Sequence, residues 1–263
     1  MSILNISFRK EIHDLVHSMR PISLDEMDAI KLLNRNDTKY TIHERQLPEI
    51  LKKLSPHYKA LVVDNHRLIL YETLYYDTDS LDLYLAHHNG KRTRDKIRFR
   101  KYVDTGGVFF EIKHKTNKGK TEKSRVTVDE IDQSIQNKAE KLLGKKTILD
   151  SNTLHPQLSI LFTRFTLANN DLTERVTIDI NLSCTDEKIT KQFPGLAIIE
   201  IKQDRFNKFS PIIHVLQELR IFPGGISKYC LSMASLNQTI KHNRFKPRLR
   251  RINKMLYGHS QLV

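Results

Sequence analysis

Charged side chains occupy every second position in two neighbouring segments of the sequence. Arg98 and Arg100 alternate with apolar residues in the first segment, and Glu111 and Lys113 do so in the second. Because successive side chains of a β-strand point to opposite faces of the sheet, each pair shares one face of its strand. Guanidinium and ammonium groups are the donors that phosphate oxygens favour. The spacing therefore indicates a phosphate-binding surface built on a sheet.

The same alternation recurs along the rest of the chain. The further charged positions are Arg35, Lys39, Lys123, Arg125, Arg164, Arg175, Glu200 and Lys202. Arg164 and Glu200 interrupt runs that are otherwise apolar, where an ion without a partner would be very costly to bury. A sheet with one wet face would explain the alternation. It would not explain the excess of cations, whereas a closed cavity that holds a polyanion explains both features.

Carboxylates are few on this charged face. Glu111 and Glu200 stand among the cations, one in each of two apolar strand segments. Hard divalent cations take oxygen ligands and complete their coordination with substrate phosphates. The two carboxylates therefore indicate a divalent metal that binds together with a phosphorylated ligand.

The elements that must position these residues form an antiparallel sheet with helices around it. Strands are predicted over residues 35–42, 68–76, 97–102, 109–115, 121–128, 158–167, 175–182 and 196–202, where β-formers predominate. Helices are predicted over residues 23–33, 43–54, 79–88, 128–143, 210–219 and 226–242, where apolar residues recur at helical spacing. Residues 1–22 are mixed in character and are expected to pack loosely. Since the sequence has no internal repeat and no low-complexity linker, we expect a single α+β domain.

The net charge of +14 over 263 residues points to a polyanionic partner, such as nucleic acid, anionic lipid or a phosphorylated small molecule. Part of the excess is local, because residues 241–254 hold seven lysines and arginines and no acidic residue. The remainder of the chain is basic even without this tail. We interpret the tail as a solvated helix end or flexible arm in preference to a nucleic-acid or membrane-surface site.

The cysteines and the N-terminus bear on the cellular compartment. Cys184 and Cys230 provide neither a disulfide framework nor a metal knuckle, and both stand in apolar surroundings. The first residues lack the long apolar run of a secretory signal, and no window approaches the roughly 20 apolar residues of a membrane span. We therefore expect a reduced, soluble, cytoplasmic protein.

A series of short motifs follows in order along the chain: residues 34–40 (NRNDTKY), 72–78 (ETLYYDT), 96–102 (KIRFRKY), 110–113 (FEIK), Arg164, Arg175, 199–202 (IEIK) and 227–229 (SKY). This series resembles the VTC domain, the polyphosphate polymerase domain of the vacuolar transporter chaperone complex and its bacterial relatives. The ordered series is far more specific than any one motif. The family belongs to the triphosphate tunnel metalloenzymes, so the resemblance implies an eight-stranded antiparallel β-barrel, open at both ends, with flanking helices. It implies a tunnel domain over residues 24–240, between an N-terminal segment, 1–23, and a basic C-terminal tail, 241–263.

The resemblance also implies roles for individual residues. Triphosphate or polyphosphate would be held by the tunnel cations Lys39, Arg98, Arg100, Lys113, Lys123, Arg125, Arg164, Arg175 and Lys202. Arg98 and Arg100 would also be catalytic, together with Lys228, which resembles the lysine at the reacting phosphate. Glu200 resembles the carboxylate that binds manganese or magnesium, and Glu111 would assist it.

The implied reaction is transfer of the γ-phosphoryl group of ATP to a growing polyphosphate chain. The first strand, with the sequence RNDTK at residues 35–39, lacks the Glu-x-Glu-x-Lys pattern of the tunnel triphosphatases, which favours the polymerase branch. Two alternatives stay open here: a tunnel triphosphatase that hydrolyses ATP or another triphosphate, and a non-catalytic polyanion-binding module. ATP and polyphosphate are the expected partners, a membrane-protein partner is compatible with the family, and nucleic acid is not expected.

Overall fold

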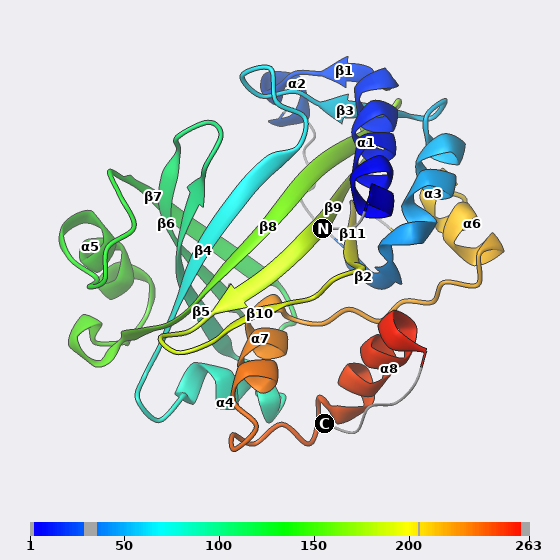
Figure 1. Cartoon of the computed structure of the whole chain (residues 1–263). Helices are drawn as coiled ribbons and strands as arrows, with labels where there is room; N and C mark the ends of the chain where they lie inside the picture. Colours follow the sequence, from blue (N-terminus) through cyan, green and yellow to red (C-terminus); the bar gives the residue numbers. More distant parts are fainter. Residues whose placement is uncertain (1–2, 29–35, 205, 259–263) are drawn as a thin grey trace.

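A computed structural model describes residues 3–28, 36–204 and 206–258, which form one large sheet surrounded by helices (Figure 1). The described strands are β1 (Arg20–Ile22), β2 (Asn36–His43), β3 (Tyr58–Leu61), β4 (Ile69–Asp77), β5 (Arg94–Tyr102), β6 (Val108–Lys115), β7 (Thr121–Val128), β8 (His155–Asn169), β9 (Glu174–Thr185), β10 (Thr190–Gln192) and β11 (Leu196–Gln203). Eight of them follow one another in the order β2-β11-β9-β8-β4-β5-β6-β7, while β10 pairs with β9, and β3 pairs with β8 and β1. The pairings along this eight-strand path are antiparallel, and β1 pairs with β3 in parallel.

The described helices are α1 (Ile3–Ser18), α2 (Leu24–Asp28), α3 (Leu47–Leu54), α4 (Asp82–His88), α5 (Asn137–Lys146), α6 (Pro211–Glu218), α7 (Lys228–Leu236) and α8 (Lys246–Tyr257). In Figure 1, α1, α3 and α6 lie on one side of the sheet, α5 lies on the opposite side, and α4, α7 and α8 lie at the lower end. The prediction of an α+β chain with a large antiparallel sheet and flanking helices is confirmed. None of the helices in the described ranges has the length and the apolar run that crossing a membrane requires.

The predicted closed barrel of eight strands is wrong. The described sheet has eleven strands, and β2 and β7, at the two ends of the eight-strand path, do not pair with each other. The free edge of β2 is instead met by the segment before α7, where the Gly224 amide donates to the Lys39 carbonyl at 2.9 Å and the Thr41 hydroxyl donates to the Gly224 carbonyl at 3.2 Å. A Cβ at Gly225 would overlap the side chain of Lys39, so this close approach requires glycine. The curled sheet therefore ends against this segment, which partly satisfies the edge of β2.

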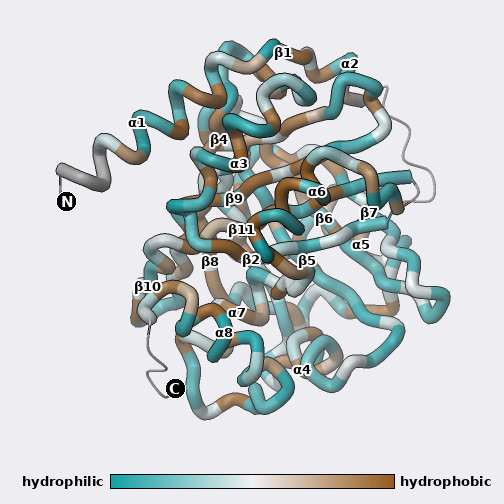
Figure 2. The backbone as a smooth tube through the Cα atoms, turned by 90° about the vertical axis from the view of Figure 1, so that its right-hand side faces the viewer, coloured by the Kyte–Doolittle hydropathy of each residue, from teal (hydrophilic) through white to brown (hydrophobic). Residues whose placement is uncertain are grey.

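The predicted alternation separates an apolar outer face of the sheet from a charged inner face. On β9, Val176 and Ile178 pack outward in a core cluster shared with α1, α3 and α6, whereas Thr177 and Asp179 line the inner face. A second cluster joins α4, α7 and α8 to the sheet, and a third joins α5 to β4, β5 and β6. Figure 2 shows apolar residues concentrated along β8, β9 and β11. Outward hydrocarbon thus holds the strands in place while their charged side chains face inward.

Two described segments near the ends of the chain pack more closely than the sequence predicted. Residues 1–22 were expected to pack loosely, but Ile12 and Val16 of α1 are fully buried against α3 and the sheet. Residues 246–257 of the basic tail form α8. Its Leu249 and Ile252 are buried beside α7 and the sheet, while its arginines face outward. The apolar residues of each helix recur at helical spacing, which gives it one face to bury.

One predicted helix begins later in the chain than expected. The helix predicted from residue 128 begins at Asn137, because the preceding residues form turns in which Asp132 accepts the Ser134 amide at 3.0 Å. Residues 29–35, which include the end of the first predicted helix and Arg35, lie outside the described residues.

Candidate functional site

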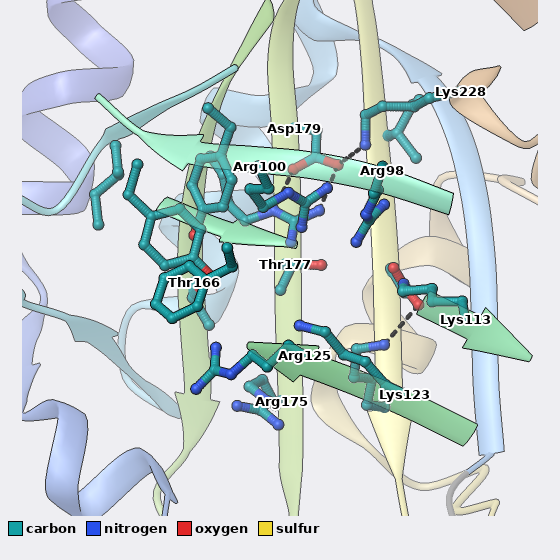
Figure 3. Close-up of a pocket in the computed structure, with 18 of the residues that line it drawn as sticks. Arg98, Arg100, Lys113, Lys123, Arg125, Thr166, Arg175, Thr177, Asp179 and Lys228 are labelled. Atoms are coloured by element: carbon teal, nitrogen blue, oxygen red, sulfur yellow. Dashed lines mark hydrogen bonds and ion pairs between the residues drawn. The ribbon is translucent and has the colours of Figure 1, made fainter. Parts of the chain in front are cut away.

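The curled sheet encloses a cavity of about 620 Å³ on its inner face (Figure 3). All eight strands of the path and the start of α7 contribute to its lining. Within the described ranges, eleven lysines and arginines line the cavity, together with three carboxylates, those of Asp64, Asp179 and Glu200. The cations are Lys39, Lys96, Arg98, Arg100, Lys113, Lys123, Arg125, Arg164, Arg175, Lys202 and Lys228. Such an excess of like charge in a small volume is unfavourable unless an anion binds there.

The structure brings the predicted site residues together. Every predicted phosphate-binding cation lines the cavity, as do Lys228 and Glu200. Glu111 lies beside the cavity lining and is fully buried. Sequence analysis assigned no role to Lys96 and Asp179, which also line the cavity. The alternation along each strand could have assigned both residues to the site, because Lys96 shares a strand face with Arg98, and Asp179 shares one with Arg175.

The first charged group is built from cross-strand neighbours on β5, β6 and β7. Arg98 lies opposite Glu111, and its Nε and Nη2 donate to Glu111 Oε2 at 2.8 and 2.5 Å. Lys123 forms an ion pair with the other oxygen of Glu111, and Arg100 lies 3.9 Å from Oε2. Burial alone would raise the pKa of Glu111, but Arg98, Arg100 and Lys123 outweigh it and hold that pKa far below its ordinary value. Glu111 is thus a permanent anion that balances part of the positive charge around it.

The second charged group joins β8, β9 and α7. Arg164 donates from Nε and Nη2 to the two oxygens of Asp179 at 2.5 and 2.8 Å, a bidentate pair. Lys228 forms an ion pair with the same carboxylate, and its Nζ lies 4.2 Å from the ring centre of Phe162. Burial would raise the pKa of Asp179, but Arg164 and Lys228 lower it to about 2. One carboxylate therefore orients two cavity cations. Figure 3 shows the contact between Asp179 and Lys228.

The third charged group lies on β2 and β11. Lys39 and Lys202 contact the same Oε1 of Glu200, at 2.5 and 2.6 Å, and Lys202 lies 3.2 Å from Asp37. Burial opposes ionisation of Glu200, but Lys202, Lys39 and Lys113 hold its pKa well below the ordinary value. Both lysines use Oε1, which leaves Oε2 as the oxygen that a further cation would take.

Burial and neighbouring arginines lower the pKa of several cavity lysines. The nearby Arg98, together with burial, holds the pKa of Lys113 well below its ordinary value. Burial lowers the pKa of Lys123 to about 8 despite the pair with Glu111. Burial is also the main cause of the lowered pKa of Lys228. A bound anion would reverse these shifts, because a negative charge stabilises the ammonium form.

The position of Lys228 is fixed by the contacts that its neighbours in the chain make with the sheet. Ser227 caps α7 by accepting the Cys230 amide at 3.4 Å, and its hydroxyl also accepts from Lys96 at 3.0 Å. The adjacent Tyr229 donates to the buried Asp77 at 2.7 Å and stacks on Tyr75 with ring centres 5.0 Å apart. The start of α7 is therefore tied to β4 and β5, and Lys228 is held at the cavity wall.

The carboxylates in and beside the cavity are the side chains that could hold a divalent metal. The described residues contain no cluster of three His, Cys, Asp or Glu side chains that could hold a metal ion. Of the two predicted ligands, Glu200 lines the cavity, whereas both oxygens of Glu111 are occupied by Arg98 and Lys123. Magnesium is commonly held by one or two carboxylates plus substrate phosphates. The donor set fits a metal that arrives with a triphosphate and uses Glu200, and it does not fit a metal centre made of protein ligands alone.

A family model described as the VTC domain matches residues 34–237 of this chain. No curated protein sequence matches. Among solved structures, the Hippeastrum protein HpAC1, described as having a dominant triphosphatase activity, is 14% identical, with 76% of this chain and 95% of that chain covered and a TM-score of 0.48. A conserved hypothetical protein from Pyrococcus furiosus is 12% identical, with 74% and 99% covered and a TM-score of 0.43. The S. pombe Pct1 RNA triphosphatase is 12% identical, with 98% and 94% covered and a TM-score of 0.28. Identities and scores this low carry no argument about the activity of this chain.

Proposed function

This chain belongs to the VTC domain family, and we propose that it is a polyphosphate polymerase that transfers the γ-phosphoryl group of ATP to the end of a polyphosphate chain. The observation that carries the proposal is the cavity itself, in which eleven cations face three carboxylates among the described residues. Family membership supports an enzyme of the triphosphate tunnel class, and the cation lining supports a long polyanionic ligand.

The proposed chemistry asks the protein for position and charge compensation. A terminal oxygen of the polyphosphate chain attacks the γ-phosphorus of ATP, the bond from that phosphorus to the β-γ bridging oxygen breaks, and ADP leaves. The attacking oxygen is already an anion, so no general base has to remove a proton. Arg98, Arg100 and Arg164 would hold the phosphate oxygens, and Lys228 would stabilise charge on the transferred group.

Glu200 is the residue that would hold a divalent metal, through Oε2. When bound, such an ion neutralises charge on the triphosphate oxygens. Lys39 and Lys202 would keep the Glu200 carboxylate in place while the triphosphate occupies the cavity.

The identity of the product tests the proposed function. Purified protein incubated with ATP and Mn²⁺ should form ADP and an acid-labile phosphate polymer that a polyphosphate-specific exopolyphosphatase degrades. The ADP released should equal the phosphate found in polymer. Release of orthophosphate without polymer would contradict the polymerase and identify a triphosphatase, and binding without turnover would identify a polyanion-binding module.

Asp179→Asn should change the pH dependence of the reaction and not only its rate. The carboxylate raises the pKa of Lys228 against the opposing effect of burial, so its removal lets Lys228 lose its proton at lower pH. We therefore expect the alkaline decrease in kcat to begin at a lower pH in the variant than in the wild type. Relative to the wild type, the variant should lose more activity at pH 9 than at pH 6.5. Asp179→Glu, which keeps the charge, is the control. A loss of equal size at every pH would indicate a purely structural role.

Affinity for inorganic tripolyphosphate should decrease as the pH rises through about 8, where Lys123 loses its proton. The affinity decreases with rising pH because the ammonium form of Lys123 binds phosphate, and the bound anion in turn raises the pKa of Lys123. Isothermal titration calorimetry from pH 7 to pH 9.5 measures this decrease in affinity. Lys123→Arg stays charged throughout and should show a smaller decrease, and an identical decrease in both proteins would exclude Lys123 as its source.

A further inference from the structure

Strand β7 forms one edge of the described sheet. Among the described residues it pairs with β6 alone, and no backbone hydrogen bond joins residues 121–127 to any other described element. Val126 and Val128 pack in the core cluster beside α5, so β7 is anchored on its outer face. An unpaired edge presents amide and carbonyl groups to which an extended chain can add as a further strand.

The charged inner face is more exposed on β7 than on β5. Arg98 and Arg100 of β5 are only 5% and 6% exposed. Lys123 and Arg125 of β7 line the same cavity and project into it in Figure 3, yet both are exposed to solvent. In a closed barrel, strands on both sides of β7 would shield these side chains. The described part of the chain therefore leaves the cavity accessible along β7.

Two rows of charged side chains cross the inner face and end at β7. In one row, Glu111 of β6 lies between Arg98 of β5 and Arg125 of β7. The other row, across the same three strands, consists of Lys96, Lys113 and Lys123. Opposite charges directly across neighbouring strands stabilise a sheet, and like charges destabilise it. Both rows end in a cation, so the next position beyond β7 favours a carboxylate in each row.

This chain does not offer those carboxylates from the segments outside the described residues. Residues 1–2, 29–35, 205 and 259–263 contain no aspartate or glutamate. A second copy of β7 is also unfavourable, because it would set the cations of one copy opposite those of the other. Its one acidic residue, Glu122, alternates with Lys123 and so lies on the outer face. The charges therefore favour a different protein as the occupant of this edge and disfavour self-association.

We propose that β7 is a docking edge for an extended acidic segment of a partner protein, which adds a strand to the sheet. Side chains of the added strand alternate between the two faces, so carboxylates at every second position would face Lys123 and Arg125. The side chains between them would lie on the outer face beside Ser124 and Val126. The fitting motif is therefore aspartate or glutamate in alternation with β-branched residues. Backbone hydrogen bonds would supply affinity, and the carboxylates would supply specificity.

A strand docked at this edge would also act on the cavity. Lys123 and Arg125 line the cavity, and the carboxylates of the added strand would occupy them. The acidic segment and a phosphate ligand should therefore weaken each other's binding, and the coupling must be equal in both directions. The edge thus provides a route by which a partner lowers the affinity of the cavity for phosphate.

Fluorescence anisotropy with labelled synthetic peptides tests the docking edge. The probe is a heptapeptide of sequence TEVEVET, and the controls are TKVKVKT and TEVEVET that is N-methylated at its central amides. N-methylation keeps the charges but removes the backbone donors. We expect the wild type to bind TEVEVET at least tenfold more tightly than either control. Arg125→Glu should weaken TEVEVET by about tenfold and strengthen TKVKVKT, because it exchanges an attractive cross-strand pair for a repulsive one. Lys118→Glu, at an exposed position of the β6–β7 turn, makes the same charge change and should alter neither affinity by more than twofold.

Two further measurements on the wild type keep the test independent of how the variants fold. Hydrogen exchange should show amides of residues 121–127 protected by TEVEVET, and inorganic tripolyphosphate should displace the peptide. Equal affinity for TEVEVET and its N-methylated form would overturn strand addition and leave only an attraction between charges. Failure of TEVEVET to bind, or equal effects of Arg125→Glu and Lys118→Glu, would overturn the docking edge. None of these results bears on catalysis, so the proposed function stands or falls separately.

Discussion

Lys228→Met should lower the rate of polyphosphate synthesis by about two to three orders of magnitude, the effect typical of removing one preorganised donor from a transition state. The side chain of Lys228 is only 14% exposed, and its ammonium is held at the cavity by Asp179. Methionine keeps a similar unbranched stem over the Phe162 ring while removing the charge. Asp179 keeps its bidentate pair with Arg164, so the substitution leaves no buried carboxylate without a partner.

Steady-state rates with ATP and Mn²⁺, together with the melting temperature, measure this effect. Lys241→Met, at an exposed position of the basic tail, is the matched control and should retain wild-type activity. A Lys228→Met enzyme that folds and retains more than a fifth of the wild-type rate would exclude the role assigned to Lys228.

Glu111→Gln should lower the free energy of unfolding by about 3–5 kcal/mol, the usual cost of removing one partner from a buried ion pair. Glu111 is fully buried, and its charge faces Arg98, Arg100 and Lys123 at once. Glutamine keeps the shape but leaves these cations to repel one another. Tripolyphosphate should restore part of the lost stability, because a bound anion supplies the missing charge and favours the folded state.

The pH dependence of stability gives an independent check on Glu111. Its pKa is depressed in the folded protein, so its contribution is fully present above the ordinary value of 4.5 and is lost as pH falls towards the folded pKa. The difference in stability between the wild type and Glu111→Gln should therefore shrink below about pH 4.5. Chemical denaturation between pH 3.5 and pH 7.5 measures it. Glu49→Gln, at an exposed carboxylate of α3, is the control, and a difference that stayed constant with pH would contradict this account.

The inner face of the sheet could be predicted from the sequence because alternation is a local property. Residues 175–180 alternate polar and apolar side chains, and the structure places the two sets on opposite faces. Lys39 and Glu200 were assigned to the site from their strand patterns and the family resemblance, and the structure pairs them across β2 and β11.

The way in which the curled sheet ends at β2 depends on contacts that no local sequence pattern specifies. Two adjacent glycines such as Gly224 and Gly225 are typical of a turn. The pairing of this segment with β2, however, depends on how the chain returns from α6. The environment of Glu111 depends on the register that sets it opposite Arg98, with Arg125 as its neighbour on β7. The basic tail was interpreted from its positive charge, and the apolar residues of α8 were not assigned to a core. Their burial depends on the surface of α7 and the sheet, which the local sequence does not specify.

The most direct test of the central claim is a crystal structure with a nonhydrolysable ATP analogue and Mn²⁺. The account predicts a triphosphate inside the cavity, in contact with Arg98, Arg100 and Arg164, and an anomalous manganese peak beside Glu200. Phosphates found outside the curled sheet, with the cavity cations left without ligand, would contradict it.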